Sequence, residues 1–312
     1  MIKILKWLGI ITGGLIVIIG LVAGYGIMQA NALLEERLDI TPETISLPSD
    51  SASLVRGEYL AYGCRECHGA NLEGKLWFGN NDEEEQLAIV HTANLTSAPG
   101  SKTASYTDAD WVRTIRHGVS PEKKLLFVMP SGDYNKLSER DLGCLIAYLK
   151  QVKPVEHPVG TSEFKPIGKI LLGLGMFGDV FLGKVIDHSA PFPTEPSRDS
   201  TIAWGGYVIG YLGCSTCHGV DYAGGTTGQP GAPLVPVINT AGHLKDWTAE
   251  QFATTIRTGQ TPEGKILNVK FMPFSAYQNL TDADFSAMDA FLRSIPARPQ
   301  NTGGVNLGVA ED

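Results

Sequence analysis

The sequence predicts an all-α protein in which an N-terminal transmembrane helix precedes two copies of one helical domain. Capped, amphipathic patterns predict helices, and no alternating pattern long enough to predict a strand is present. A set of motifs that occurs twice in one order predicts the duplication. The chain has 312 residues, of which 43% are hydrophobic, so it is long enough for two domains with sizeable cores.

The N-terminal segment, residues 1–32, is predicted to be a membrane anchor. Residues 7–28 carry no charge, and a bilayer span needs about 20 such residues. Lysines precede this stretch and Glu35 and Glu36 follow it, which places the N-terminus in the cytoplasm and exports the rest. Ala30-Asn31-Ala32 also fits a signal-peptide cleavage site, but the apolar run exceeds the usual 7–15 residues. A retained anchor is therefore favoured, followed by a polar tether over 33–50.

The duplication is clearest where residues 107–124 align with residues 248–265, with eight of 18 positions identical. A Cys-x-x-Cys-His pentapeptide lies upstream in each copy, and Met-Pro-x-x-x-Tyr lies downstream. The copies are expected at 51–153 and 201–298. They are joined by a linker over 154–200, and a tail over 299–312 follows.

Helix signals recur inside each copy. A helix is expected to lead into each Cys-x-x-Cys, over 54–62 and 202–212. Another is expected to start at Thr107 or Thr248 and to end before Gly118 or Gly259. Ser138-x-x-Asp141 and Thr281-x-x-Asp284 resemble capping boxes at the start of a last amphipathic helix. In the linker, apolar residues 167–186 predict a helix that packs on one or both domains or touches the membrane surface. The charges within this stretch make a second span costly.

Cys-x-x-Cys-His is the attachment signature of c-type haem, in which two thiols form thioethers and the adjacent imidazole coordinates iron. A redox-active pair is less favoured, because the βαβ context of thioredoxin-like proteins is missing. Half a zinc site is less favoured, because each copy lacks two further soft ligands at metal spacing. Two covalently bound haems are therefore predicted. The attachment residues are Cys64, Cys67, Cys214 and Cys217, with His68 and His218 as axial ligands.

The second axial ligands are predicted to be Met129 and Met272, which occupy equivalent places in the repeat, each before a proline. A lone methionine is more often a core residue, but the repeated context favours ligation. The other histidines have no counterpart in the other copy and are expected to be surface or hydrogen-bonded residues: His91, His117, His157, His188 and His243. Cys144 lies in a helix core pattern and is expected to be a buried, inert thiol.

Two further pairs recur in the copies. Arg116 and Arg257 occur in Ile-Arg-x-Gly segments, and Tyr134 and Tyr277 follow the methionines. Each pair is a candidate for haem propionate contacts, with ordinary packing as the equal alternative.

These motifs make residues 51–298 similar to the dihaem, class I-like cytochrome c proteins of bacteria, which include cytochrome c subunits of periplasmic dehydrogenases. The resemblance implies two tandem cytochrome c domains, His/Met ligation and electron relay outside the cytoplasmic membrane. Dehydrogenase subunits with three haems carry a third Cys-x-x-Cys-His, which this sequence does not have.

The function predicted is electron transfer between a redox donor and an acceptor, such as a dehydrogenase or terminal oxidase, rather than catalysis. Two six-coordinate irons would leave no open position for a substrate. The alternative is a dihaem enzyme of the peroxidase or thiosulfate dehydrogenase type. The formal net charge of −8 gives no basic footprint for nucleic acid. The expected location is the periplasmic side of the bacterial cytoplasmic membrane, held by a single-pass helix.

Overall fold

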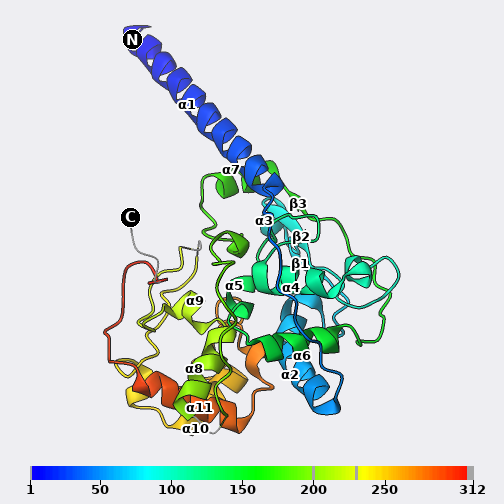
Figure 1. Cartoon of the computed structure of the whole chain (residues 1–312). Helices are drawn as coiled ribbons and strands as arrows, with labels where there is room; N and C mark the ends of the chain where they lie inside the picture. The colour runs from blue at the N-terminus through cyan, green and yellow to red at the C-terminus, as the bar shows by residue number, and fades with distance from the viewer. Residues whose placement is uncertain (1, 199–200, 229–230, 308–312) are drawn as a thin grey trace. The chain divides into compact units, whose positions relative to one another are not determined.

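The computed structural model describes residues 2–198, 201–228 and 231–307 of the chain, which is mostly helical as expected (Figure 1). Two compact units are present. One comprises the residues up to Arg37 together with 76–91 and 160–179. The other comprises 38–75, 92–159 and the residues from Val180 onward. Both Cys-x-x-Cys-His motifs lie in this second unit, which is called the haem-motif unit below.

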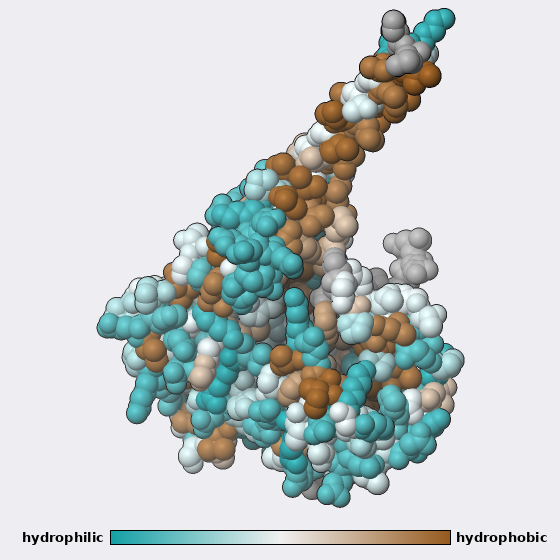
Figure 2. All heavy atoms as spheres, turned by 180° about the vertical axis from the view of Figure 1, so that it is seen from behind, coloured by the Kyte–Doolittle hydropathy of each residue, from teal (hydrophilic) through white to brown (hydrophobic). Residues whose placement is uncertain are grey.

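Helix α1, Ile2–Glu35, dominates the first unit. Its mean hydropathy reaches 2.3 and only 6% of the apolar window is buried, so it is long and apolar enough to cross a bilayer. Brown, hydrophobic atoms cover most of the helix at the upper right of Figure 2. The apolar N-terminal helix expected from the sequence is therefore present.

Helix α7, Pro166–Gly173, packs against α1 in the same unit. The two backbones approach closely, because a Cβ on Gly173 would lie 1.8 Å from the Gly26 carbonyl oxygen. Lys169 Nζ also donates to Asn31 Oδ1 at 2.9 Å. The linker helix is thus shorter than the expected 167–186, since glycines with positive φ at 175 and 178 follow its end. Its observed partner is α1.

The all-α expectation was wrong for a small antiparallel sheet in the first unit, with strand order β1-β2-β3. Its strands are β1 Leu76–Phe78, β2 Ala88–His91 and β3 Glu163–Phe164, and the short helix α3, Asp82–Glu85, connects the first two. Strands of two to four residues are too short for alternation to stand out in a sequence, and β3 pairs with β2 across more than 70 intervening residues.

The haem-motif unit contains two runs of elements in nearly the same order. The first run is α2 Ser51–His68, η1 Lys102–Ser105, α4 Asp108–His117, α5 Ser131–Tyr134 and α6 Glu139–Leu149. After η2, Leu182–Lys184, the second run is α8 Thr201–Tyr211, α9 Cys214–His218, η3 His243–Lys245, α10 Ala249–Thr258, η4 Phe274–Tyr277 and α11 Asp282–Ser294.

The predicted caps are observed. Thr107 and Thr248 begin α4 and α10 with complete capping boxes, and Gly118 and Gly259 end them in the left-handed conformation. Thr281 begins α11 with a capping box as well. Ser138 caps α6, but its partner Asp141 turns its carboxylate to other groups, described below.

The first and last helices of each run cross at a glycine. A Cβ on Gly57 would lie 2.1 Å from the Cys144 carbonyl oxygen, and one on Gly205 would lie 1.9 Å from that of Ala287. Counted from these crossings, the second run has two more residues before its first cysteine than the first run. The chain accommodates them by interrupting the helix at Gly213, whose φ is +74°, whereas α2 continues through its motif.

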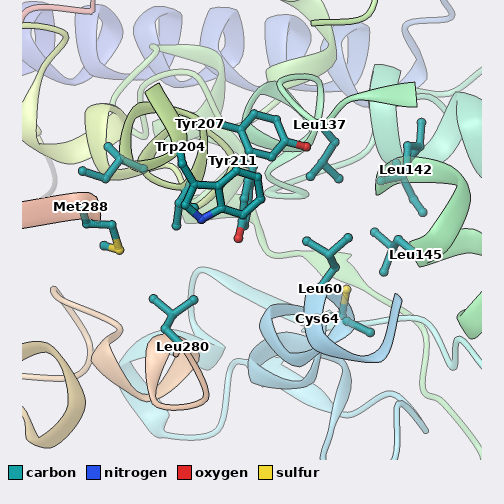
Figure 3. Packing of buried hydrophobic residues seen from close by; sticks show 14 of the residues in the cluster. Leu60, Cys64, Leu137, Leu142, Leu145, Trp204, Tyr207, Tyr211, Leu280 and Met288 are labelled. Atoms are coloured by element: carbon teal, nitrogen blue, oxygen red, sulfur yellow. The ribbon is translucent and has the colours of Figure 1, made fainter. Parts of the chain in front are cut away.

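The two runs share a core that is held by a reciprocal pair of buried aspartates. Asp141 on α6 accepts two bonds from Arg56 of its own run and one from Tyr207 of the other run. Asp284 on α11 accepts from Trp204 of its own run at 2.8 Å and from Tyr59 of the other run at 2.5 Å. Figure 3 shows Trp204, Tyr207 and Tyr211 gathered in this cluster with leucines of both runs. Such satisfied polar contacts fix one packing of the two runs.

Candidate functional site

The first attachment motif forms the last turn of α2. Cys64 and Cys67 stand three residues apart on one helix face, and His68 follows directly. His68 Nδ1–H donates to the Ala93 carbonyl oxygen at 2.7 Å. This bond orients the ring and assigns the proton to Nδ1, while Nε2 has no hydrogen-bond partner among the described residues. Nε2 is therefore the atom available to a metal.

The second motif repeats this geometry in α9, which carries Cys214 and Cys217. His218 Nδ1–H donates to the Pro236 carbonyl oxygen at 2.9 Å. Burial lowers the pKa of both His68 and His218, with the backbone hydrogen bond opposing it in each case. Both imidazoles are thus kept neutral, which is the form that ligates iron.

The chain leaves both motifs by the same turn. Gly69 and Gly219 have φ near +88° and +79°, a conformation that glycine adopts without strain. Gly74 N–H then donates to the His68 carbonyl oxygen at 2.7 Å, as Gly224 N–H does to that of His218 at 2.9 Å. Each histidine is therefore held both at its ring and at its backbone.

The cysteines suit covalent attachment better than direct metal binding. Burial raises the pKa of the Cys64 thiol to about 11 and that of Cys214 to about 12, and it also raises the pKa of Cys217. Metal ligands and reactive redox pairs need thiolates instead. Among residues 2–198, 201–228 and 231–307, no three His, Cys, Asp or Glu side chains converge as a direct metal site. Protonated thiols beside a neutral, oriented imidazole fit a c-type haem.

Both methionines lie at the same kind of turn. Ser131 N–H donates to the Met129 carbonyl oxygen at 2.7 Å, and Phe274 N–H donates to that of Met272 at 2.7 Å. The intervening prolines have nearly equal conformations, with φ −77° in both and ψ of 49° and 59°. The turns thus hold both side chains outside a regular helix, although the ligation itself stays a prediction.

The tyrosines join each methionine turn to its own attachment motif. Tyr134 Oη lies 4.0 Å from Cys64 Sγ, and Tyr277 Oη donates to the Leu212 carbonyl oxygen at 3.3 Å. Burial raises the pKa of both phenols well above the ordinary value. Each Met-Pro-x-x-x-Tyr segment is therefore brought beside the cysteines that precede it by about 60 residues in the chain.

The arginines have protein partners. Arg116, which is fully buried, donates to Glu43, to the Asn135 carbonyl oxygen and to the Ala190 carbonyl oxygen. Arg257 donates to the Leu280 carbonyl oxygen and to Asp282. Both arginines hold the segment that follows a methionine turn. These contacts correspond to a packing role, which was the alternative to a propionate contact. A propionate contact stays a prediction for both.

Sequence reasoning missed the contacts that link the runs at the motifs themselves. Thr216 Oγ1 of the second motif donates to Asp133 in the first methionine turn at 3.0 Å. Ser275 Oγ of the second methionine turn donates to Glu66 of the first motif at 2.9 Å. Glu66 and Thr216 are both the second variable residue of Cys-x-x-Cys-His, so a polar side chain at this place was the available signal.

Of the remaining histidines, His117 and His188 lie together. His117 Nδ1 is 2.9 Å from His188 Nδ1, and its Nε2 is 2.8 Å from Glu43. His188 Nε2 donates to the Gly183 carbonyl oxygen. Both are hydrogen-bonded residues, as expected. Cys144 is fully buried in α6, also as expected.

The chain is similar to known cytochrome c proteins. Residues 208–296 match the cytochrome c family. The chain is 25% identical to the fructose dehydrogenase cytochrome subunit of Gluconobacter japonicus over 84% of this chain and 55% of that protein. It is 25% identical to the alcohol dehydrogenase (quinone) cytochrome c subunit of Gluconacetobacter polyoxogenes over 90% of this chain and 62% of that protein. This chain therefore spans only part of the length of either subunit.

A third relative has nearly the same length. The dihaem cytochrome c-type protein of Cereibacter sphaeroides is 25% identical over 92% of this chain and 98% of its own length. The family match and the relatives confirm the resemblance drawn from the motifs: the chain contains a cytochrome c domain, which implies covalently bound haem c, and is similar to cytochrome c subunits of bacterial dehydrogenases.

Proposed function

We propose that this protein is a membrane-anchored dihaem c-type cytochrome that relays electrons from a dehydrogenase-type donor to an acceptor. In this proposal residues 51–153 form a second cytochrome c domain beside the matched one, with the linker over 154–200 between them. The observation that carries it is the equivalence of the two motifs: in both, Nδ1 of the histidine is bonded to a backbone carbonyl and Nε2 is left for iron.

The residues have distinct roles in such a relay. Cys64, Cys67, Cys214 and Cys217 hold the two haems covalently, with His68/Met129 and His218/Met272 as the axial pairs. The haems supply reversible one-electron chemistry. Methionine thioethers favour the reduced iron.

The location and partners belong to the same proposal. Helix α1 would anchor the chain in the cytoplasmic membrane, and the exposed apolar residues of and beside α7, Ile167, Leu174 and Met176, would touch the same surface. A signal peptide has the same composition, so N-terminal sequencing of the mature protein decides between anchor and signal. The relatives named as subunits of fructose and alcohol dehydrogenases favour a dehydrogenase as the donor.

The central test is a spectroscopic count of the haems and their ligands on protein matured in a host that attaches haem c. We expect two haems per chain by mass, both low-spin by electron paramagnetic resonance, with an absorption band near ~695 nm that is typical of methionine–iron bonds and equivalent to two haems. One haem per chain would overturn the second domain. A high-spin or thiolate-ligated haem would favour the alternative, an enzyme of the peroxidase or thiosulfate dehydrogenase type.

A further inference from the structure

We propose that Asp133, a residue of the first methionine turn, sets the reduction potential of the haem attached at Cys214 and Cys217, and that Lys136 moderates its effect. The inference rests on the proposed function, because it needs both haems. It assigns a role to a carboxylate from one run in the haem site of the other.

The position of Asp133 carries the argument. Its side chain is about nine-tenths buried and accepts from Thr216 Oγ1, between the two cysteines of the second motif, at 3.0 Å. A Cβ on Gly213, which directly precedes that motif, would lie 2.3 Å from Asp133 Oδ2. The carboxylate therefore packs against the start of the second attachment motif.

Its charge reaches the attachment atoms. The Asp133 carboxylate contributes to the raised pKa of both Cys214 and Cys217, after burial as the main cause. The same field acts on any group attached to these sulfurs. A negative charge in a buried environment stabilises ferric over ferrous iron, so it lowers the potential of the adjacent haem.

Lys136 places a positive charge beside the Asp133 carboxylate. Its Nζ donates to Asp133 Oδ1 at 3.2 Å and to Ser215 Oγ of the same motif at 3.4 Å, while its side chain stays 41% exposed. This cation offsets part of the carboxylate's field. Removing Lys136 must therefore shift the potential opposite to removing the charge of Asp133.

The reciprocal contact provides an internal comparison. Glu66 of the first motif accepts from Ser275 of the second methionine turn, so a carboxylate also lies at the first haem site. There the carboxylate belongs to the motif itself, and the residue equivalent to Asp133 is Ala276. The two haems thus receive their nearby negative charge from different places, although from the same run of the chain.

The test is a spectroelectrochemical redox titration of the full haem-loaded protein, in which the two midpoint potentials are resolved. The wave of the second haem is identified separately with Met272→His, because exchange of methionine for histidine lowers that potential and removes one methionine–iron band. Asp133→Asn keeps the shape and the acceptor for Thr216 but removes the charge. We expect it to raise the potential of the second haem, changing its ratio of reduced to oxidised iron about tenfold at fixed potential, which is ~59 mV for one electron.

Two variants control for structure. Lys136→Gln, at a partly exposed position, is expected to lower the same potential, whereas loosening of the packing would move both variants in one direction. Glu66→Gln is expected to raise the potential of the first haem more than that of the second. The inference is wrong if Asp133→Asn and Lys136→Gln leave the second potential unchanged, or shift it with the same sign, while two haems are bound. A wild-type protein with fewer than two haems would overturn the proposed function instead, and the haem count separates these results.

Discussion

The two runs of the haem-motif unit share their local contacts but differ in the segments that pack against them. Both hold a histidine by a backbone carbonyl, begin α4 or α10 with a threonine cap and cross their outer helices at a glycine. The first run, however, recruits the tether and the linker: Arg116 and His117 both contact Glu43, and Arg116 also donates to Ala190. At the equivalent places the second run has Arg257 with the 90% exposed Asp282, and the exposed Thr258. The shared contacts orient both histidines, and the added segments brace the first run.

The largest expected difference concerns the reciprocal aspartates. Asp141→Asn leaves the buried Arg56 without its counter-charge, and we expect a loss of about 3–5 kcal/mol in the free energy of unfolding. Asp284→Asn faces only neutral donors, from Tyr59, Trp204 and its capping partner Thr281, so we expect a smaller loss of about 1–2 kcal/mol. Chemical denaturation of the haem-loaded protein measures both. Equal losses would show that Arg56 does not depend on the charge of Asp141 for its stability in the core.

The arginines in the last turns of α4 and α10 should differ in the same sense. Arg116→Met leaves the Asn135 and Ala190 carbonyl oxygens without this donor and removes one of the two side-chain partners of Glu43, so we expect a loss of about 2–4 kcal/mol. Arg257→Met removes a largely exposed ion pair and one carbonyl contact, so about 1 kcal/mol is expected. A redox titration of the same variants tests the propionate prediction. A shift in potential without a change in stability would favour propionate contact over bracing.

Features formed by residues close together in the sequence could be predicted, whereas contacts between distant residues could not. Thr107, Thr248 and Thr281 cap helices through residues three positions away, so their patterns are visible locally. The attachment motifs are equally local. The link between Asp133 and Thr216 joins residues 83 positions apart, and no spacing announces it. Aligning the copies by their cysteines also hides the true partners, because two extra residues before Cys214 make Tyr207, not Ile209, the structural equivalent of Tyr59.

Removing the hydroxyls of Tyr59 and Tyr207 should have smaller effects on stability than the changes above. Tyr59→Phe and Tyr207→Phe each remove one hydroxyl that crosses from one run to the aspartate of the other. We expect a loss of about 1 kcal/mol for Tyr59→Phe and a larger loss for Tyr207→Phe, because the Tyr207 hydroxyl also accepts from the buried Ser138 N–H at 3.0 Å. The two losses should add in the double variant if the two bonds act independently. Denaturation of the two single variants and the double variant gives the coupling. If either variant were as stable as the wild type, that hydroxyl would not contribute to the packing of the two runs.

The first run has a titratable histidine, His117, where the second run has Thr258, so the two runs should differ in how pH affects their stability. Burial lowers the pKa of His117, which the bond to Glu43 only partly offsets. For Glu43, burial raises the pKa, but the bonds from His117 and Arg116 outweigh it and the net shift is downward. As the pH falls below the unfolded value of 6.5, the unfolded chain therefore takes up a proton at His117 before the folded chain does, and stability falls. The contribution of Glu43 is lost at lower pH, below 4.5.

Unfolding free energies measured between pH 7 and 5 test this assignment. His117→Gln should make the pH slope shallower in that window, because it removes one of the histidines whose pKa is lowered in the folded state. Thr258→His places a histidine at the equivalent but exposed position of the second run and should leave the slope as it is in the wild type. If both variants changed the slope alike, the pH dependence would follow from histidine content alone. A slope altered only by His117→Gln would locate it in the segment where tether, linker and first run meet.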